Sequence, residues 1–256
     1  MKSIRVIGFL VCFLHCATPS LIRGQGTFQN LDFESANVPP SGPQPYGTFV
    51  SVGSALPDWT AYLGTGRLTQ VGYNSPTAGT ATISLLGPTW NNSDVALYRV
   101  GIIDGNYSVT LQSGGMPANI LVGENASIGQ NGTVPATAES VQFEALAIGP
   151  FSVSFAGNAL DPVALSSGRS PDGLAYTLYG ANISAWAGQS GELEFTADYN
   201  VHDPYLVLDD ISFSPTAVTP EPDPLALMGV GAALFAAYRR LMENRKVESR
   251  KKKCSM

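Results

Sequence analysis

The long central part of this chain lacks lysine and has very little positive charge of any kind. Between Gln25 and Asp223 the only bases are Arg67, Arg99 and Arg169, while the same span holds eighteen acids, so its formal charge is 3 − 18 = −15. The whole-chain value of −6 conceals this because most of the other bases lie at the two ends. A surface of this charge repels phosphate backbones, which argues against nucleic acid as a partner.

The central part also lacks cysteine and is poor in histidine. Cys12, Cys16 and Cys254 all lie outside it, so disulfides and cysteine-based zinc sites are not expected within it. His202 is its only histidine, and no G-x-S-x-G nucleophile elbow occurs. We therefore predict no catalytic residues and no enzyme activity. The formal candidates for glycoside hydrolysis are the carboxylate pairs Glu192 with Glu194 and Glu139 with Glu144.

Helical periodicity is absent before Leu225, and apolar residues instead alternate with polar ones. The alternation is clearest in four segments, at 81–85, 107–111, 151–155 and 192–198, and Gly- and Pro-containing turns separate the segments. Short alternating strands with such turns predict an all-β fold, an antiparallel β-sandwich of the jelly-roll kind, over residues 25–214. About 190 residues are enough to build a conventional core there.

Both ends of the chain carry features of membrane targeting. Lys2 and Arg5 precede the apolar stretch from Val6 to Ala17, which predicts a secretory signal peptide over residues 1–24. Residues 215–224 form a proline-rich linker. The apolar run from Leu225 to Tyr238 is short of the roughly 20 residues of a comfortable spanning helix, but residues up to 242 could extend it. The basic tail, 243–256, would then stay in the cytoplasm. An amphipathic or buried helix is the alternative.

The C-terminal features together resemble the PEP-CTERM sorting signal. The resemblance rests on Pro220, Glu221 and Pro222, on the Gly-containing apolar run, and on Arg239 and Arg240. It implies export in a Gram-negative bacterium, processing by an exosortase-type membrane protease, and a final place at the cell surface or in the extracellular polysaccharide matrix. The chain departs from the pattern because it continues for sixteen residues, Leu241 to Met256, after the two arginines.

Two acidic segments at the ends of the central part could bind a metal ion. Alternation places Asp32 and Glu34 on one face of a predicted strand, and it places Asp209 among apolar residues of another, where a buried charge needs a partner. These segments, with those around Trp59 and Trp186, resemble galactose-binding-like jelly rolls, the fold of many carbohydrate-binding modules. The resemblance implies a structural calcium held by Glu34 and Asp210, with Asp32 and Asp209 as alternates. The alternative is that these carboxylates accept backbone N–H groups at strand ends.

A carbohydrate site would need an exposed aromatic ring beside polar groups. The candidates are Trp90, Trp59 and Tyr73, and Trp90 is the first choice because its surroundings are typical of a loop; core packing is the alternative for each ring.

The leading hypothesis for the whole chain is an exported, non-enzymatic protein of the cell surface or extracellular matrix. The alternatives are a calcium-stabilised, lectin-like carbohydrate-binding module and, less favoured, a glycan hydrolase or lyase.

Overall fold

A computed structural model describes residues 25–38, 48–76, 80–90, 100–116, 119–199, 204–218 and 238. The predicted signal peptide, Pro220, Glu221, Pro222, Arg239, Arg240 and the basic tail lie outside these residues, as does the predicted C-terminal helix apart from Tyr238. Among the described residues, no helix has the length and apolar character needed to cross a bilayer.

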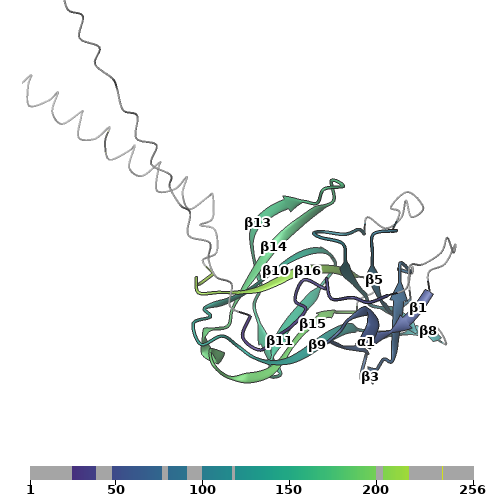
Figure 1. Ribbon diagram of the computed structural model, residues 1–256, viewed down its shortest axis with the longest axis horizontal. Coiled ribbons are helices and arrows are strands. Elements are labelled where there is room, and N and C mark those ends of the chain that lie inside the picture. The colour runs from purple at the N-terminus through teal and green to yellow at the C-terminus, as the bar shows by residue number, and fades with distance from the viewer. Residues whose placement is uncertain are drawn as a thin grey trace, which may run out of the picture.

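The described chain is built almost wholly from strands, arranged in two large sheets and one hairpin (Figure 1). The eight-stranded sheet runs β1 (Thr48–Ser51), β4 (Gln70–Tyr73), β5 (Thr82–Leu86), β6 (Ser108–Gln112), β16 (Tyr205–Ser214), β10 (Ser140–Ile148), β14 (Ala175–Asn182) and β13 (Val163–Arg169). The six-stranded sheet runs β12 (Asn158–Leu160), β11 (Phe151–Phe155), β15 (Ser190–Ala197), β9 (Ala126–Thr133), β2 (Thr60–Leu63) and β3 (Gly66–Arg67). The hairpin is β7 (Gly114–Met116) with β8 (Asn119–Glu124), and the described helices are α1 (Val52–Ala55) and η2 (Ser184–Trp186).

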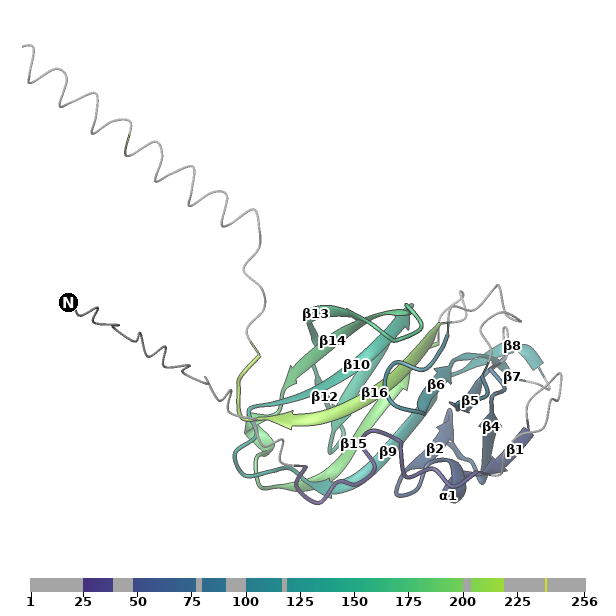
Figure 2. The same cartoon turned by 45° about the horizontal axis from the view of Figure 1, so that its top comes forward.

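The strand order defines a jelly roll. Eight of the strands form the nested sets β6-β16-β10-β14 in one sheet and β9-β15-β11-β12 in the other, so the first of the eight pairs with the last and the second with the second last. Figure 2 shows β14, β10 and β16 in one layer and β15 and β9 in the other. The pairs within these two sets are antiparallel; β4 and β5, outside them, run parallel. The predicted antiparallel β-sandwich is confirmed.

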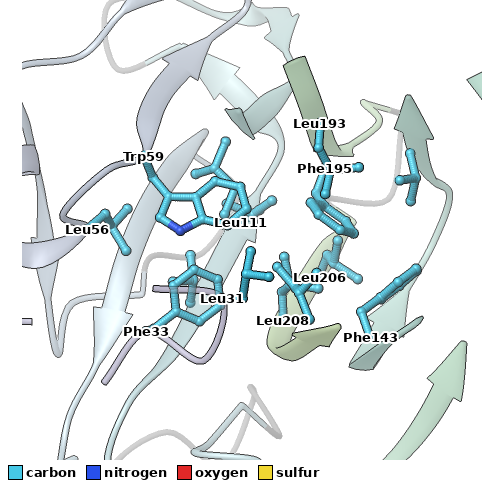
Figure 3. Packing of buried hydrophobic residues seen from close by; sticks show 14 of the residues in the cluster. Leu31, Phe33, Leu56, Trp59, Leu111, Phe143, Leu193, Phe195, Leu206 and Leu208 are labelled. Atoms are coloured by element: carbon cyan, nitrogen blue, oxygen red, sulfur yellow. The ribbon is translucent and has the colours of Figure 1, made fainter. Parts of the chain in front are cut away.

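The main core lies between the two sheets and is built by alternation along the strands. On β15, Leu193 and Phe195 are fully buried while Glu192 and Glu194 stay partly exposed, as the sequence pattern predicts. Phe195 meets Phe143 of the facing sheet edge to face, with ring centroids 5.1 Å apart (Figure 3). Burial of each such side chain contributes about 1.5–3 kcal/mol, so both rings stabilise the packing of one sheet on the other.

The segment 25–38 is not the strand that the sequence predicts. The alternation is right, since Leu31 and Phe33 are buried and Asp32 is exposed, but the backbone forms turns. Asn30 and Phe33 have φ of 49° and 59°, a left-handed conformation that a regular strand cannot contain. The turns still bring the segment beside the last strand, where the Ile211 N–H donates to the Leu31 carbonyl at 2.9 Å.

A second, smaller apolar cluster covers the other face of the eight-stranded sheet. Its buried members are Leu86, Val100, Ile103 and Val207. Val207 alternates with Leu206 and Leu208, which belong to the main core, so the cluster lies on the opposite side of β16. Residues 100–103 therefore cross the outer face of this sheet and bury part of it.

Candidate functional site

The side chain of Glu34 is hydrogen-bonded to the loop that precedes β6. Its Oε1 accepts the backbone N–H groups of Asn106 at 2.6 Å and Tyr107 at 2.9 Å, and its Oε2 accepts the Asn106 side-chain amide at 2.9 Å. The loop turns at Gly105, whose φ of 58° and lack of a Cβ leave room for this carboxylate. Glu34 therefore acts as a clasp on residues 104–108.

Asp209, on the neighbouring strand β16, is hydrogen-bonded to the same loop. It is 1% exposed, and its Oδ2 accepts the Ser108 hydroxyl at 2.5 Å and the Asp104 N–H at 3.1 Å. Its Oδ1 accepts the Asp210 N–H at 2.8 Å, in a bulge where Asp210 has a φ of 39°. Burial raises the pKa of Asp209 to about 8, because the free-energy cost of burying the charged carboxylate exceeds the stabilisation of that charge by its three hydrogen-bond donors.

As placed, three of the four predicted calcium ligands, Glu34, Asp209 and Asp32, accept hydrogen bonds from the protein itself. The oxygens of Glu34 and Asp209 face N–H and O–H donors, which a cation would have to displace, and Asp32 is exposed with one oxygen on the Glu34 N–H at 3.3 Å. Within the described ranges, no three His, Cys, Asp or Glu side chains gather as a metal site would require. For Glu34 and Asp209 this is the arrangement of the alternative prediction, carboxylates that accept backbone N–H groups.

Two of the three predicted sugar platforms are core residues. Trp59 is 4% exposed, lies between Phe33 and Phe195, and donates its indole N–H to the Asn30 carbonyl at 2.9 Å (Figure 3). Tyr73 is 3% exposed, and its ring lies against Gly87. The prediction that these rings face solvent is therefore wrong, because both point between the sheets rather than away from them.

Trp90 lies at the edge of the second cluster and is half-buried. Its indole N–H donates to the Val100 carbonyl at 3.0 Å, and its backbone N–H donates to the Gly87 carbonyl at 2.7 Å, so the ring folds back over the sheet. Two further half-buried aromatic residues, Tyr176 and Tyr205, pack on the same cluster. We call Trp90, Tyr176 and Tyr205 the aromatic face.

Polar groups lie beside the aromatic face. Glu144 stands directly opposite Asp209 in the register of β10 and β16, and it is hydrogen-bonded to the side chain of Tyr176. Burial, followed by the charge and hydrogen bond of Glu144, raises the pKa of the Tyr176 hydroxyl. On β6, Oγ1 of Thr110 and Nε2 of Gln112 are buried without a hydrogen-bond partner on this same side of the sheet. A buried polar group without a hydrogen-bond partner is costly.

The sequence patterns did not single out Tyr176 or Tyr205 as members of a site, and they offered Glu144 only as a formal hydrolytic partner of Glu139. Tyr205 opens an apolar strand, and Tyr176 and Glu144 lie on strands that the sequence reads as ordinary alternation. One indication was present in the spacing of the tyrosines on β14: Tyr176 and Tyr179 are three residues apart, so their side chains lie on opposite faces of the strand. This spacing does not tell which face of the strand packs against the other sheet, so it could not identify Tyr176 as the tyrosine on the outer face.

The carboxylate pair on β15 lies on the outer face of the six-stranded sheet. Glu192 and Glu194 are both partly exposed, as alternation predicts for a wet strand face. Burial and then the nearby charge of Glu194 raise the pKa of Glu192. Its carboxylate lies over Gly129, where a Cβ would come within 2.4 Å of Oε1.

The fold places this chain in the class of antiparallel jelly-roll sandwiches. No protein-family model and no curated protein sequence matches the chain. Among solved structures it is similar to TmCBM61, a carbohydrate-binding module in complex with β-1,4-galactotriose, at 12% identity and a TM-score of 0.35 over 74% of this chain and 98% of that chain. It is also similar to the enzymatically active domain of tailspike protein 4 of bacteriophage CBA120, at 14% identity and a TM-score of 0.31 over 67% of this chain and 22% of that chain. Both scores are too low to support an inference about ligand or activity.

Proposed function

We propose that this protein is an exported, non-enzymatic surface protein whose jelly roll binds carbohydrate through the aromatic face. The supporting observation is that three aromatic side chains from separate segments, Trp90, Tyr176 and Tyr205, lie half-buried around one cluster beside Glu144. Ligand sites commonly combine apolar rings with a few fixed polar groups, and a sugar offers both an apolar ring face and hydroxyl groups.

The polar groups beside the rings suit hydroxyl-bearing ligands. Glu144 is an acceptor fixed through its hydrogen bond with Tyr176. The indole N–H of Trp90 donates to the Val100 carbonyl, and this hydrogen bond fixes the plane of the ring. Trp90 would therefore contact a sugar by stacking its ring on the sugar ring. A glycan ring bound there would need little reordering of the protein, because these side chains are already held.

The place of action in this proposal comes from the two ends of the chain. The signal peptide over 1–24 and the PEP-CTERM-like signal at Pro220, Glu221 and Pro222 with Arg239 and Arg240 support export, membrane anchoring through the C-terminal helix, and processing by an exosortase-type protease. The partner would be the extracellular polysaccharide of a Gram-negative bacterium. Mass spectrometry of the protein from its host tests this part, since an intact C-terminus in the mature protein contradicts it.

The binding part is tested on a glycan array with the full-length protein. We expect binding to at least one polysaccharide and its loss in Trp90→Ala, because removing an anchoring aromatic ring costs more than 1 kcal/mol in typical interfaces, roughly fivefold in affinity or more. The matched control is Trp186→Ala, since Trp186 is also half-buried but packs on Phe155 of the other sheet. Equal losses in both variants, or no binding by the parent protein, would refute the site.

A further inference from the structure

Tyr199 is an exposed aromatic residue that none of the sequence patterns singled out. It follows β15 and is 39% exposed, although a tyrosine ring gains free energy by leaving water. Exposure of one ring is ordinary by itself. The surroundings of this ring are unusual because they fix it in place without covering it.

A glycine forms the floor under the Tyr199 ring. A Cβ added at Gly123 on β8 would lie 2.0 Å from Cε1 and 2.1 Å from Cζ of Tyr199, so the ring rests directly on the strand backbone. Any other residue at position 123 would push the ring away. One side of the ring is thereby supported, while much of the side chain stays in contact with solvent.

Asn125 fixes the backbone at the same place. Its Oδ1 accepts the Tyr199 N–H at 2.7 Å, and its carbonyl accepts the Gly64 N–H at 2.9 Å, so it joins the end of β15 to the turn between β2 and β3. Because Oδ1 is used in this way, the exposed amide can offer Nδ2 as a donor. Glu124, the neighbour of Gly123 on β8, instead lies against Gly64.

We infer that Tyr199, with Asn125, forms a second contact for a sugar ring, apart from the three residues of the aromatic face. The held ring supplies a stacking surface and Asn125 a donor, and the ring has little side-chain freedom to lose on binding. The ligand class is an uncharged polysaccharide, because the formal charge of −15 between Gln25 and Asp223 repels uronic acids. This inference rests on the proposed carbohydrate binding.

The test is affinity electrophoresis of the full-length protein in gels that contain galactan, galactomannan, β-glucan or polygalacturonate. We expect retardation by a neutral polymer and none by polygalacturonate. Tyr199→Ala should weaken binding about fivefold or more, as the loss of an anchoring ring does, while Tyr199→Phe should retain it. Gly123→Ala should also weaken binding because its methyl group displaces the ring, and its backbone is not in a left-handed conformation that would make alanine costly for another reason. Phe49→Ala is the control, since Phe49 is a 67% exposed ring on β1.

The outcomes separate the two proposals. If Trp90→Ala weakens binding but Tyr199→Ala and Gly123→Ala behave as the parent protein, the Tyr199 contact is wrong and the aromatic face stands. Stronger retardation by polygalacturonate than by the neutral polymers overturns the assigned ligand class. If the parent protein is retarded by none of the four polymers, the carbohydrate function fails and the Tyr199 contact falls with it.

Discussion

The buried carboxyl of Asp209 should make the stability of this protein fall as pH rises through neutrality. The pKa of Asp209 is about 8 in the fold, and an aspartate in an unfolded chain titrates near about 3.9. Between these values the folded chain holds a proton that the unfolded chain has lost, so folding takes up one proton. The free energy of unfolding should therefore fall by about 1.4 kcal/mol for each pH unit between about 4 and 8, and level off above that range.

Urea unfolding followed by tryptophan fluorescence measures this at pH 5, 6, 7 and 8. We expect the parent protein to lose about 4 kcal/mol over this range relative to Asp209→Asn, which cannot ionise. Asparagine keeps one acceptor oxygen for the donors Ser108 and Asp104 but places an amide near the Asp210 N–H, so its absolute stability will differ. The comparison therefore uses the slopes alone. Parallel slopes for the two proteins would show that Asp209 is ionised in the fold and that its three donors outweigh its burial.

Two further changes test the clasp on the loop 104–108. A chelator should leave the thermal midpoint unchanged, because the Glu34 and Asp209 oxygens already face N–H and O–H donors; a drop that added calcium reverses would contradict this. Gly105→Ala should lower stability by about 1 kcal/mol or more in urea titrations, since Gly105 has a φ of 58° and a methyl group there would lie 2.4 Å from Oε1 of Glu34. Gly53→Ala, with open space around it, is the matched control, and an equal effect of the two would refute the reasoning.

The sequence predicted the class of fold because alternation reports burial directly. Leu193 and Phe195 face the core and Glu192 and Glu194 face solvent, as their order along β15 requires. The same rule placed Leu31 and Phe33 inside yet failed on the backbone. Alternation constrains side chains, whereas the turns of this segment depend on distant partners such as the Gln130 side chain, which bonds both the N–H and the carbonyl of Gln29.

The candidate sites were harder to predict because exposure of a ring depends on contacts between distant segments. Trp59 and Trp90 are both flanked by turn residues in sequence, but Trp59 points between the sheets and Trp90 lies on the outside of one. Tyr199 is supported by a glycine 76 positions earlier in the chain, a relation that no local pattern contains. The sequence therefore indicates which residue types could form a sugar site, but it does not indicate which aromatic rings remain exposed in the fold.

The clasp and the aromatic face are parts of one structural arrangement. Ser108 accepts the Ile103 N–H at 2.9 Å and donates to Asp209, so the carboxyl that holds the loop also holds the end of the segment 100–103. That segment provides Val100 and Ile103 to the second cluster, and Val100 accepts the indole N–H of Trp90. The position of the Trp90 ring thus depends on Asp209 through a chain of three hydrogen bonds and one apolar cluster. The carboxyl of Asp209, which the sequence predicted as an alternate calcium ligand, thus helps to position the surface that we propose binds carbohydrate.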